Sequence, residues 1–306
     1  ADDSSITLRP EFTAGFVRAY ISNGMHSWPQ PVKLYTIGPS FRRERPQAGR
    51  LRQHSQINCE ILGEEDPAAD VEVMMLAMNL YRELGFRGLT FQLNSTGCPV
   101  CKPGYIEKLV AYLGDHHDRL AAIDKERLTK NPLRVLDCKV PGCAPTIAGA
   151  PAIDSCLCGN CRSALTEVTG LLDAAGVTWV RNPRLVRGLD YYTRTVFEIV
   201  AAAGAGLGSQ STVCAGGRYN GLVAELGGPD TPAIGWGLGM ERLLLLMPPV
   251  PEASSGLFGL VLSAPGMPSA PGFKLAQALR SRGRSVDLAP AGKLDKQFKQ
   301  AERLGA

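Results

Sequence analysis

Apolar residues recur along the first 93 residues at two different spacings, which predict helices alternating with strands. The segments 13–21 and 70–85 repeat apolar side chains at helical intervals. The segment 32–38 and the one that follows Arg50 instead alternate apolar and polar positions, as half-buried strands do. A PQAG sequence between those two segments predicts a turn that reverses one strand into the next. We therefore expect residues 1–93 to form the first part of an α+β domain.

The pattern changes over residues 94–177 and returns to strand character afterwards. Seven of the nine cysteines lie in 94–177, among helical pieces and a small, proline-rich stretch, which predicts an inserted, mostly helical subdomain. Residues 178–248 resume with the segment 186–200, expected as a strand, and close with a strand and a helix over 233–247. We expect this part to complete the α+β domain.

The last part of the chain has a third pattern. Residues 248–256 are a linker by composition, being rich in proline and small residues. Beyond them, apolar and amphipathic segments follow in the order strand, helix, strand, helix across residues 257–306. This order predicts the beginning of a parallel α/β domain.

Composition narrows the class of protein. The 306 residues are 44% hydrophobic and 20% charged, which is typical of a soluble globular chain. No apolar run approaches the roughly 20 residues that a membrane-spanning helix needs, and the opening segment has no signal-peptide pattern. Nine cysteines, an odd number, favour reduced thiols or metal ligands over a disulfide framework. We expect a cytoplasmic protein without a membrane anchor.

Arginine is concentrated in one short segment. Residues 41–60 hold five arginines around the PQAG turn, so this hairpin would present several guanidinium groups together. Guanidinium binds phosphate oxygens bidentately and stays charged at any working pH, which favours a phosphate-binding hairpin. A solvated basic hairpin is the alternative interpretation. The net charge of +4 does not by itself identify a nucleic-acid binder.

The glycine-rich segment 233–247 resembles a nucleotide loop only superficially. In 233–247 the glycine spacing differs from that of a dinucleotide-binding loop, and the Lys-Ser/Thr of a P-loop is absent. We expect a strand whose glycines let a ligand lie against the backbone, followed by a helix with Arg242 in its first turn. An ordinary buried strand and helix would explain the pattern equally well. The segment 214–222, CAGGRYNGL, is expected as a turn.

The segment RGLDYYTRT, residues 187–195, places two arginines, an aspartate and two adjacent tyrosines between apolar runs. Together with the segments above and TLRPEFT at 7–13, it resembles the bacterial histidyl-tRNA synthetases, a family of class II aminoacyl-tRNA synthetases. The resemblance covers nearly the whole chain. The corresponding family motifs are the histidine-binding loop at 7–13, motif 2 from residue 41, the two histidine signatures at 185–192 and 215–222, and motif 3 at 237–246.

The resemblance implies a fold and an activity. The implied fold is α+β: a class II antiparallel-sheet catalytic domain with an inserted mostly helical subdomain, followed by a partial α/β anticodon-binding domain. The implied reaction is ATP-dependent activation of L-histidine, with Mg²⁺ on the phosphates, and transfer to the 3′ end of histidine tRNA by a homodimer. The family's motif 1 and the rest of its anticodon-binding domain have no counterpart here, so we expect a chain truncated at both ends.

Site residues follow from the resemblance one by one. Arg187 is implied as the catalytic arginine, together with Arg42 and Arg242. The implied histidine pocket consists of Glu11, Thr13, Gln56, Glu60, Tyr191, Tyr192 and Gly217. The implied ATP site consists of Arg42, Glu44, Arg50, His54 and Arg242. These side chains suit the substrate, because a buried carboxylate accepts an imidazole N–H and a tyrosine hydroxyl complements it. Phe12 departs from the family, which usually has glycine there.

The cysteines suggest a metal site. Cys98 and Cys101 form one C-x-x-C pair, and Cys158 and Cys161 form a second. Two such pairs have the ligands for one tetrahedral zinc ion. The gap between them is longer than in a compact zinc ribbon, so reduced, partly buried thiols are the alternative.

Two other functions remain open at this point. The histidyl-synthetase-like regulatory subunit of ATP phosphoribosyltransferase has the same fold and binds histidine without aminoacylation. The intact LVRGLDYY segment and the paired Arg42 and Arg242 favour the enzyme, because a sensor needs no clamp for an α-phosphate. A nucleic-acid-binding module organised by the cysteine region is the third hypothesis, and metal content would test it.

Overall fold

The computed structural model describes residues 5–43, 46–47, 49–201, 211–247 and 257–306. The chain forms two compact units, residues 1–248 and 249–306. Each unit is built on its own sheet. No helix in the described ranges is long and apolar enough to cross a membrane.

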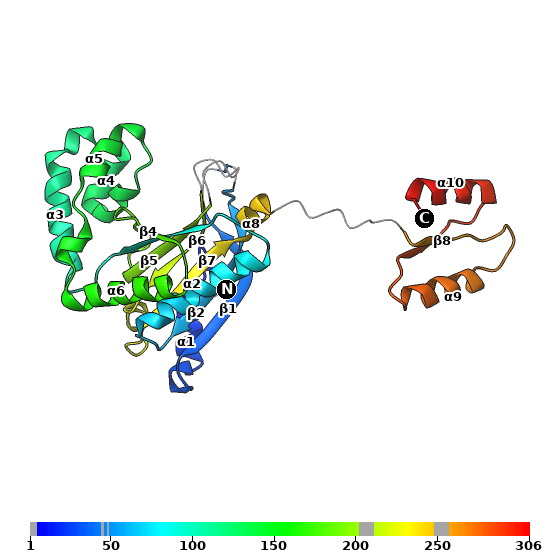
Figure 1. Cartoon of the computed structure of the whole chain (residues 1–306), viewed down its shortest axis with the longest axis horizontal. Helices are drawn as coiled ribbons and strands as arrows, with labels where there is room; N and C mark the ends of the chain where they lie inside the picture. The colour runs from blue at the N-terminus through cyan, green and yellow to red at the C-terminus, as the bar shows by residue number, and fades with distance from the viewer. Residues whose placement is uncertain (1–4, 44–45, 48, 202–210, 248–256) are drawn as a thin grey trace. The chain divides into compact units, whose positions relative to one another are not determined.

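The first unit is built on a seven-stranded sheet (Figure 1). Neighbouring strands are antiparallel except the last pair, β3 and β4, which is parallel. This arrangement confirms the expected antiparallel-sheet α+β fold. In spatial order the strands are β1 (Val32–Phe41), β2 (Gln53–Leu62), β7 (Ala233–Gly239), β6 (Thr212–Arg218), β5 (Thr193–Val200), β3 (Thr90–Ser95) and β4 (Trp179–Arg181).

The first two strands form the arginine-rich hairpin that the sequence predicts. Their register runs from Val32 opposite Leu62 to Phe41 opposite Gln53. Beyond the strands, Gln47 pairs with Arg50 across the PQAG turn. The connection therefore brings Arg42, just after β1, beside Arg52, just before β2, and the N–H of Arg42 donates to the carbonyl of Arg52 at 2.8 Å.

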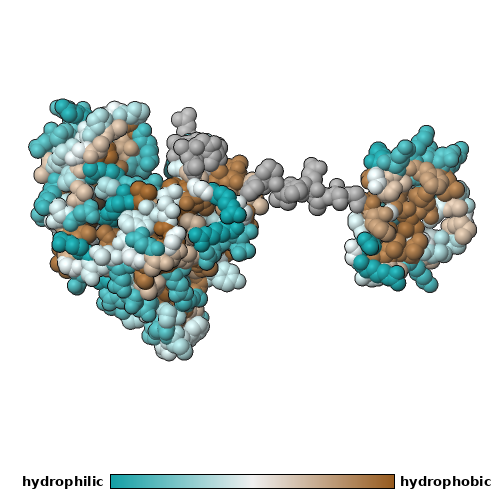
Figure 2. All heavy atoms as spheres, viewed as in Figure 1, coloured by the Kyte–Doolittle hydropathy of each residue, from teal (hydrophilic) through white to brown (hydrophobic). Residues whose placement is uncertain are grey.

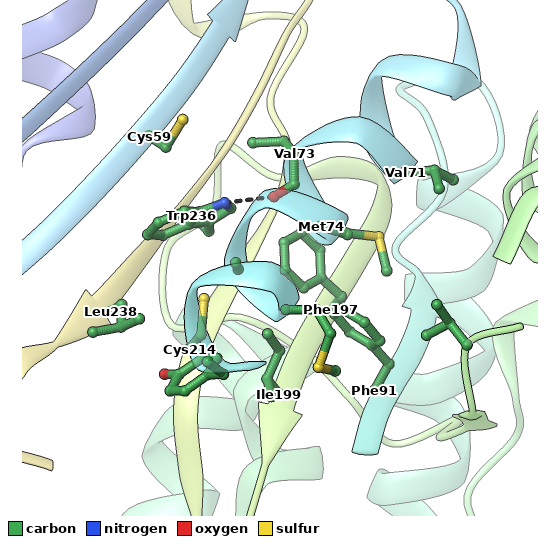
Figure 3. Close-up of a cluster of buried hydrophobic side chains, with 14 of the residues drawn as sticks. Cys59, Val71, Val73, Met74, Phe91, Phe197, Ile199, Cys214, Trp236 and Leu238 are labelled. Atoms are coloured by element: carbon green, nitrogen blue, oxygen red, sulfur yellow. Dashed lines mark hydrogen bonds between the residues drawn. The ribbon is translucent and has the colours of Figure 1, made fainter. Parts of the chain in front are cut away.

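Helices cover the apolar face of the sheet. α2 (Pro67–Glu83) begins where the side chain of Asp66 caps the N–H of Ala68, and it packs beside α6 (Gly159–Ala174). Figure 3 shows the core between α2 and the sheet, where the indole N–H of Trp236 on β7 donates to the carbonyl of Val73 at 2.7 Å. A buried indole with its polar atom satisfied fixes the helix against the strand without an unpaired donor.

A second, smaller core lies where α1 (Thr13–Ser22), the short helix η1 (Met25–Ser27) and α7 (Leu222–Glu225) meet the sheet. Tyr20 on α1 and Val223 on α7 are among its fully buried side chains. This packing holds the start of α1 against β2 and β7. The helix α8 (Met240–Leu246) follows β7 directly, as expected.

Two of the expected local structures are wrong. The segment 186–200 is not one strand, because β5 begins only at Thr193. Gly188 and Leu189 are bends, Asp190 and Tyr191 form a turn, and Arg194 has the left-handed φ of 51°, with a register shift between residues 193 and 196. The segment 214–222 is not simply a turn either, since Cys214 to Arg218 lie within β6. Its glycines serve close strand packing, because a Cβ at Gly216 would lie 2.1 Å from the carbonyl oxygen of Gly235.

The region between β3 and α6 is helical and has a core of its own, in which Tyr105, Leu109 and Leu113 are fully buried. The return helix α6 also contributes Val168 and Leu172 to the main core. The helices between β3 and α6 are α3 (Lys102–Asp115), η2 (His117–Arg119), α4 (Ala122–Lys130), η3 (Pro132–Asp137), η4 (Pro141–Cys143), α5 (Ala144–Gly149) and η5 (Ile153–Cys156).

The second unit has the predicted order of elements. They are β8 (Gly259–Val261), α9 (Ser269–Arg280), β9 (Val286–Leu288) and α10 (Leu294–Leu304), with the two strands parallel. Figure 2 shows hydrophobic residues over much of the visible face of this unit. Phe258, Phe273 and Phe298 are among its exposed apolar side chains.

Candidate active site

One buried carboxylate organises the polar face of the sheet. Glu60 on β2 is 1% exposed. The hydroxyl of Thr13, the first residue of α1, donates to its Oε1 at 2.8 Å, and the hydroxyl of Tyr219 donates to its Oε2 at 2.7 Å. Two hydroxyl donors thus fix both oxygens of one carboxylate, from segments distant in sequence.

Three glycines of the neighbouring strand β7 lie beside this carboxylate. The polar residues Gln56, Asn58 and Glu60 alternate along β2, so they share one face of the sheet. Each stands directly opposite a glycine of β7: Gly239, Gly237 and Gly235 respectively. A Cβ at position 235 would lie 1.5 Å from Oε2 of Glu60, and one at position 237 would lie 2.8 Å from Oδ1 of Asn58. The face therefore presents polar groups from one strand over bare backbone of the next.

The environment of Glu60 changes its acidity. Burial raises the pKa of its carboxyl to about 8, although the hydrogen bonds from Tyr219 and Thr13 act in the opposite direction. The negative charge of Glu11 raises the pKa further. Without a charged partner this carboxyl therefore holds its proton near pH 7, whereas a cation or an N–H donor beside it would favour the ionised form by offsetting the cost of the buried charge.

Tyrosines and a second carboxylate surround Glu60. The ring of Tyr191 lies 4.7 Å from that of Tyr192 and 5.8 Å from that of Tyr219. A Cβ at Gly217 would lie 2.9 Å from the ring of Tyr192, so glycine leaves room for that ring. Glu11 accepts the backbone N–H of Thr13 at 2.6 Å and that of Ala14 at 3.1 Å. It therefore caps the first turn of α1.

Arg187 stands against a carboxylate and an aromatic ring. Its Nη1 forms an ion pair with Oε1 of Glu198 on β5, and its guanidinium lies 5.9 Å from the ring centre of Tyr192. Burial alone would lower the pKa of Arg187, but Tyr192 and Glu198 outweigh it and raise the pKa above the ordinary value. The buried Nε of Arg187 has no hydrogen-bond partner within the described part of the chain. A permanently charged group with an unused donor suits an anionic ligand.

Further arginines meet at the end of the hairpin. Arg242 donates from Nε to the carbonyl of Gly49 at 2.8 Å and from Nη1 to that of Thr212 at 2.7 Å. Burial lowers the pKa of Arg242, and the positive charges of Arg50 and Arg42 lower the pKa further. Arg42 also donates to the carbonyl of Pro10 at 2.9 Å. Three neighbouring guanidiniums repel one another, so an anion between them would be favourable.

The structure brings most of the predicted site residues to one face of the sheet, but two need separate mention. His54 is on β2, opposite Ser40 of β1. Glu44 lies outside the described residues. Phe12 is buried, and a Cβ at Gly38 of β1 would lie 3.3 Å from its ring. The four predicted metal ligands also meet one another: the sulfurs of Cys98, Cys101, Cys158 and Cys161 all lie within 4.8 Å of one another.

Three residues of this face are missing from the sequence-based site. Tyr219 and Glu198 contact predicted residues directly. The buried Nδ2 of Asn58 has no hydrogen-bond partner among the described residues. The signal for Asn58 was present in the sequence, because polar residues at period two faced a G-x-G-x-G strand. No local sequence pattern identifies Glu198 as a site residue, because its ion pair with Arg187 depends on the path of the chain between the two residues.

Comparison with known proteins places this geometry in a family. Residues 1–248 match the model of the tRNA synthetase class II core domain (G, H, P, S and T). The histidine–tRNA ligase of Desulfitobacterium hafniense (strain DSM 10664 / DCB-2) is 46% identical over 308 aligned positions, covering 99% of this chain and 72% of that protein. The same enzyme of Nitratidesulfovibrio vulgaris (strain DP4) is 45% identical, with equal coverage.

Solved structures agree. Apo histidyl-tRNA synthetase of S. aureus is 35% identical, with a TM-score of 0.78, 99% of this chain and 74% of that chain covered. An ATP phosphoribosyltransferase regulatory subunit/histidyl-tRNA synthetase from Bacillus halodurans is 20% identical, with a TM-score of 0.62, 92% of this chain and 73% of that chain covered. That second likeness concerns the fold. The family model and the relatives at about 45% identity together establish that the chain belongs to the histidyl-tRNA synthetase family of class II aminoacyl-tRNA synthetases.

Proposed function

We propose that the chain activates L-histidine with ATP to form histidyl-adenylate and transfers the histidyl group to the 3′ end of histidine tRNA. The observation that supports this most directly is the arrangement of Glu60. Its carboxylate is buried, fixed by Thr13 and Tyr219, and set over glycine backbone on the same sheet as a group of arginines. A basic side chain and a triphosphate are the ligands that these two neighbouring environments would accept.

The histidine pocket is proposed around Glu60 and the tyrosines. Glu60 would accept an N–H of the imidazole, while Tyr191 and Tyr192 hold the ring in register. Thr13 keeps the carboxylate oriented, and Glu11 would attract the α-amino group. Gln56 and Gly217 complete the proposed pocket, the first as a polar neighbour and the second by leaving space beside Tyr192. A pocket built for N–H donors rejects amino acids that lack them.

The ATP site is proposed at the arginines. Arg42, Arg50 and Arg242 would bind the phosphates, His54 would stack on adenine, and Glu44 is carried over from the family motif. Magnesium binds mostly through phosphate oxygens, water and one or two carboxylates. Among the described residues no group of three or more possible metal ligands meets on this face. That is compatible with Mg²⁺ entering on ATP, where it neutralises phosphate charge.

Arg187 is proposed as the catalytic residue. Its guanidinium would stabilise the charge that develops on the α-phosphate when the histidine carboxylate attacks in line. Glu198 and Tyr192 hold that guanidinium in place and keep it charged. The terminal ribose hydroxyl of the tRNA would then attack the adenylate.

The test of this function is histidine-dependent exchange of labelled pyrophosphate into ATP. Exchange with histidine and with none of the other amino acids would support the proposal. Histidine binding without exchange would point to the regulatory-subunit function instead. The arginine group argues against that alternative, because a histidine sensor has no need to bind a triphosphate.

Assembly and location are further parts of the proposal. β1 is an edge strand of the sheet, and its Tyr35 and Ile37 are exposed by 76% and 57%. An exposed apolar edge of this kind favours pairing, which supports a homodimer. Light scattering at several concentrations would test it. All nine cysteines lie in the described part of the chain and none forms a disulfide, which supports a reducing compartment such as the cytoplasm.

A further inference from the structure

Four cysteine sulfurs meet at the base of the helical insertion. Sγ of Cys98 lies 3.7 Å from Sγ of Cys101 and 3.8 Å from Sγ of Cys158. Sγ of Cys101 lies 3.7 Å from Sγ of Cys161. The two C-x-x-C pairs are sixty positions apart along the chain, so the fold and not the local sequence brings them together.

These separations match the edges of a tetrahedral zinc site. A Zn–S bond of about 2.3 Å in tetrahedral geometry places the sulfurs about 3.8 Å apart. A disulfide requires about 2.05 Å, and the structure has four free thiols here. Four thiolates at these separations would repel one another strongly, so a cation between the two pairs would be favourable.

The backbone is also arranged for such a site. Cys101 is the N-cap of α3 and Cys158 is the N-cap of α6, so both pairs sit at helix N-termini, where thiolates are favoured. The N–H of Cys98 donates to Sγ of Cys101 at 3.2 Å. Gly97 has the left-handed φ of 71°, and a Cβ there would lie 2.9 Å from Sγ of Cys101. Glycine at position 97 thus permits the backbone turn that brings the sulfurs of Cys98 and Cys101 together.

We propose that Cys98, Cys101, Cys158 and Cys161 bind one structural Zn²⁺ ion. All four ligands come from the protein, which leaves no open position for a substrate. The ion replaces one proton on each thiol, and the four protons are released to solvent. Lys102 and Arg162 lie next to the two pairs in sequence and supply positive charge near the resulting anionic centre.

The site would have a mechanical role for the segment that precedes β5. Thr96 and Gly97 exchange backbone hydrogen bonds of 2.8 Å with Arg194. Lys102 donates to the carbonyl of Tyr192 at 3.2 Å, and the hydroxyl of Thr96 donates to it at 3.3 Å. The residues on either side of the first cysteine pair therefore hold the backbone of the tyrosine segment.

A second group of possible ligands is a weaker candidate. Asp124, Cys138 and Cys143 also lie within 4.8 Å of one another. Asp124, however, already forms an ion pair of 2.9 Å with Arg127, and the group has only three members. It serves as an internal comparison.

The experiment is metal analysis of the full 306-residue chain, purified under reducing conditions without added metal. We expect one zinc per chain by mass spectrometry, lost in Cys158→Ser and retained in Cys156→Ser, which changes a neighbouring thiol outside the group. Retention in Cys138→Ser would exclude the second group. Zinc that survives Cys158→Ser, or that disappears in Cys138→Ser alone, would overturn the proposal.

Cobalt substitution covers the case in which a cysteine variant fails to fold. The wild-type chain, stripped of metal and refilled with Co²⁺, should show the charge-transfer and d–d absorption of a tetrahedral tetrathiolate centre. A chain that holds no metal, with four thiols open to alkylation or with a Cys98–Cys101 disulfide, would also refute the site.

Discussion

Tyr219 donates its hydroxyl hydrogen to Oε2 of Glu60 at 2.7 Å, beside the position where Gly217 of β6 stands opposite Gly235 of β7. The bond joins the residue that follows β6 to a residue in the second half of β2. It makes the position of the carboxylate depend on both strands. Substitutions in either strand are therefore expected to shift the carboxylate of Glu60.

Gly235→Ala is expected to weaken histidine binding strongly. Its new Cβ would lie 1.5 Å from Oε2 of Glu60 and 2.6 Å from the carbonyl of Cys59, so the carboxylate must leave its hydrogen bonds. Losing buried bonds of this kind costs about 1–3 kcal/mol each, which corresponds to at least about tenfold in the dissociation constant. Calorimetric titration with histidine measures it.

The matched control is Gly239→Ala on the same strand and face, where a Cβ would meet nothing within 4 Å. It should bind histidine, without ATP present, like the wild type. Equal affinity of the two variants would contradict the proposed place of the imidazole.

Stability should depend on pH through Glu60. Its pKa is about 8 in the folded chain against an ordinary value of 4.5. Between these values the folded chain keeps a proton that the unfolded chain has released, so the free energy of unfolding falls as the pH rises. The stabilising contribution is complete below about pH 4.5 and lost above about pH 8, a difference on the order of 5 kcal/mol.

Urea unfolding of the wild type and of Glu60→Gln between pH 5 and 9 would measure the contribution of this carboxyl to the free energy of unfolding, because the amide of the variant does not titrate. The stability of the wild type relative to the variant should decline across this range. A constant difference would mean that Glu60 is ionised throughout.

Arg187→Ala is expected to abolish adenylate formation while histidine binding is largely kept. A charge that acts on the developing transition state typically contributes about 10²–10³ in kcat. Glu198→Gln should lower kcat less and leave the KM for histidine unchanged, because Glu198 acts by holding Arg187. Pyrophosphate exchange measures both variants, and normal turnover in Arg187→Ala would refute its catalytic role.

Lys102→Met is expected to raise the KM for histidine several-fold with zinc content unchanged. The substitution removes the hydrogen bonds to the carbonyls of Tyr192 and Asp190, but Lys102 is not a ligand. Lys108→Met, an exposed position on the same helix, is the control. A fall in kcat at constant KM would show that the segment positions something other than histidine.

Local patterns predicted the elements better than the way they meet. The hairpin at the PQAG turn and the strand and helix around Arg242 follow from residue spacing alone, and the structure has both. The start of β5 at Thr193 could not be predicted this way. It depends on the bends and turn after Arg187 and on two backbone hydrogen bonds, one from Thr96 to Arg194 and one from Arg194 to Gly97, about a hundred residues apart in sequence.

The candidate site has the same division. Resemblance supplied the residue types, while the pairing of Arg187 with Glu198 required the turn between them to be seen. Tyr219 lies two positions after the predicted Gly217 in the sequence, yet its contact with Glu60 arises from the strand order β2-β7-β6. The strand order of a sheet determines which residues face each other across it, and local periodicity in the sequence does not predict that order.

The two cysteine pairs also bear on how freely the length of the helical insertion can change during evolution. They mark the points at which the polypeptide leaves the sheet region after β3 and returns through α6, so the helical insertion is a loop closed at its neck. The entropy of closing a loop grows only slowly with its length. Helices can therefore be gained or lost between Cys101 and Cys158 over evolution at little cost in stability, while the sheet receives the same two ends.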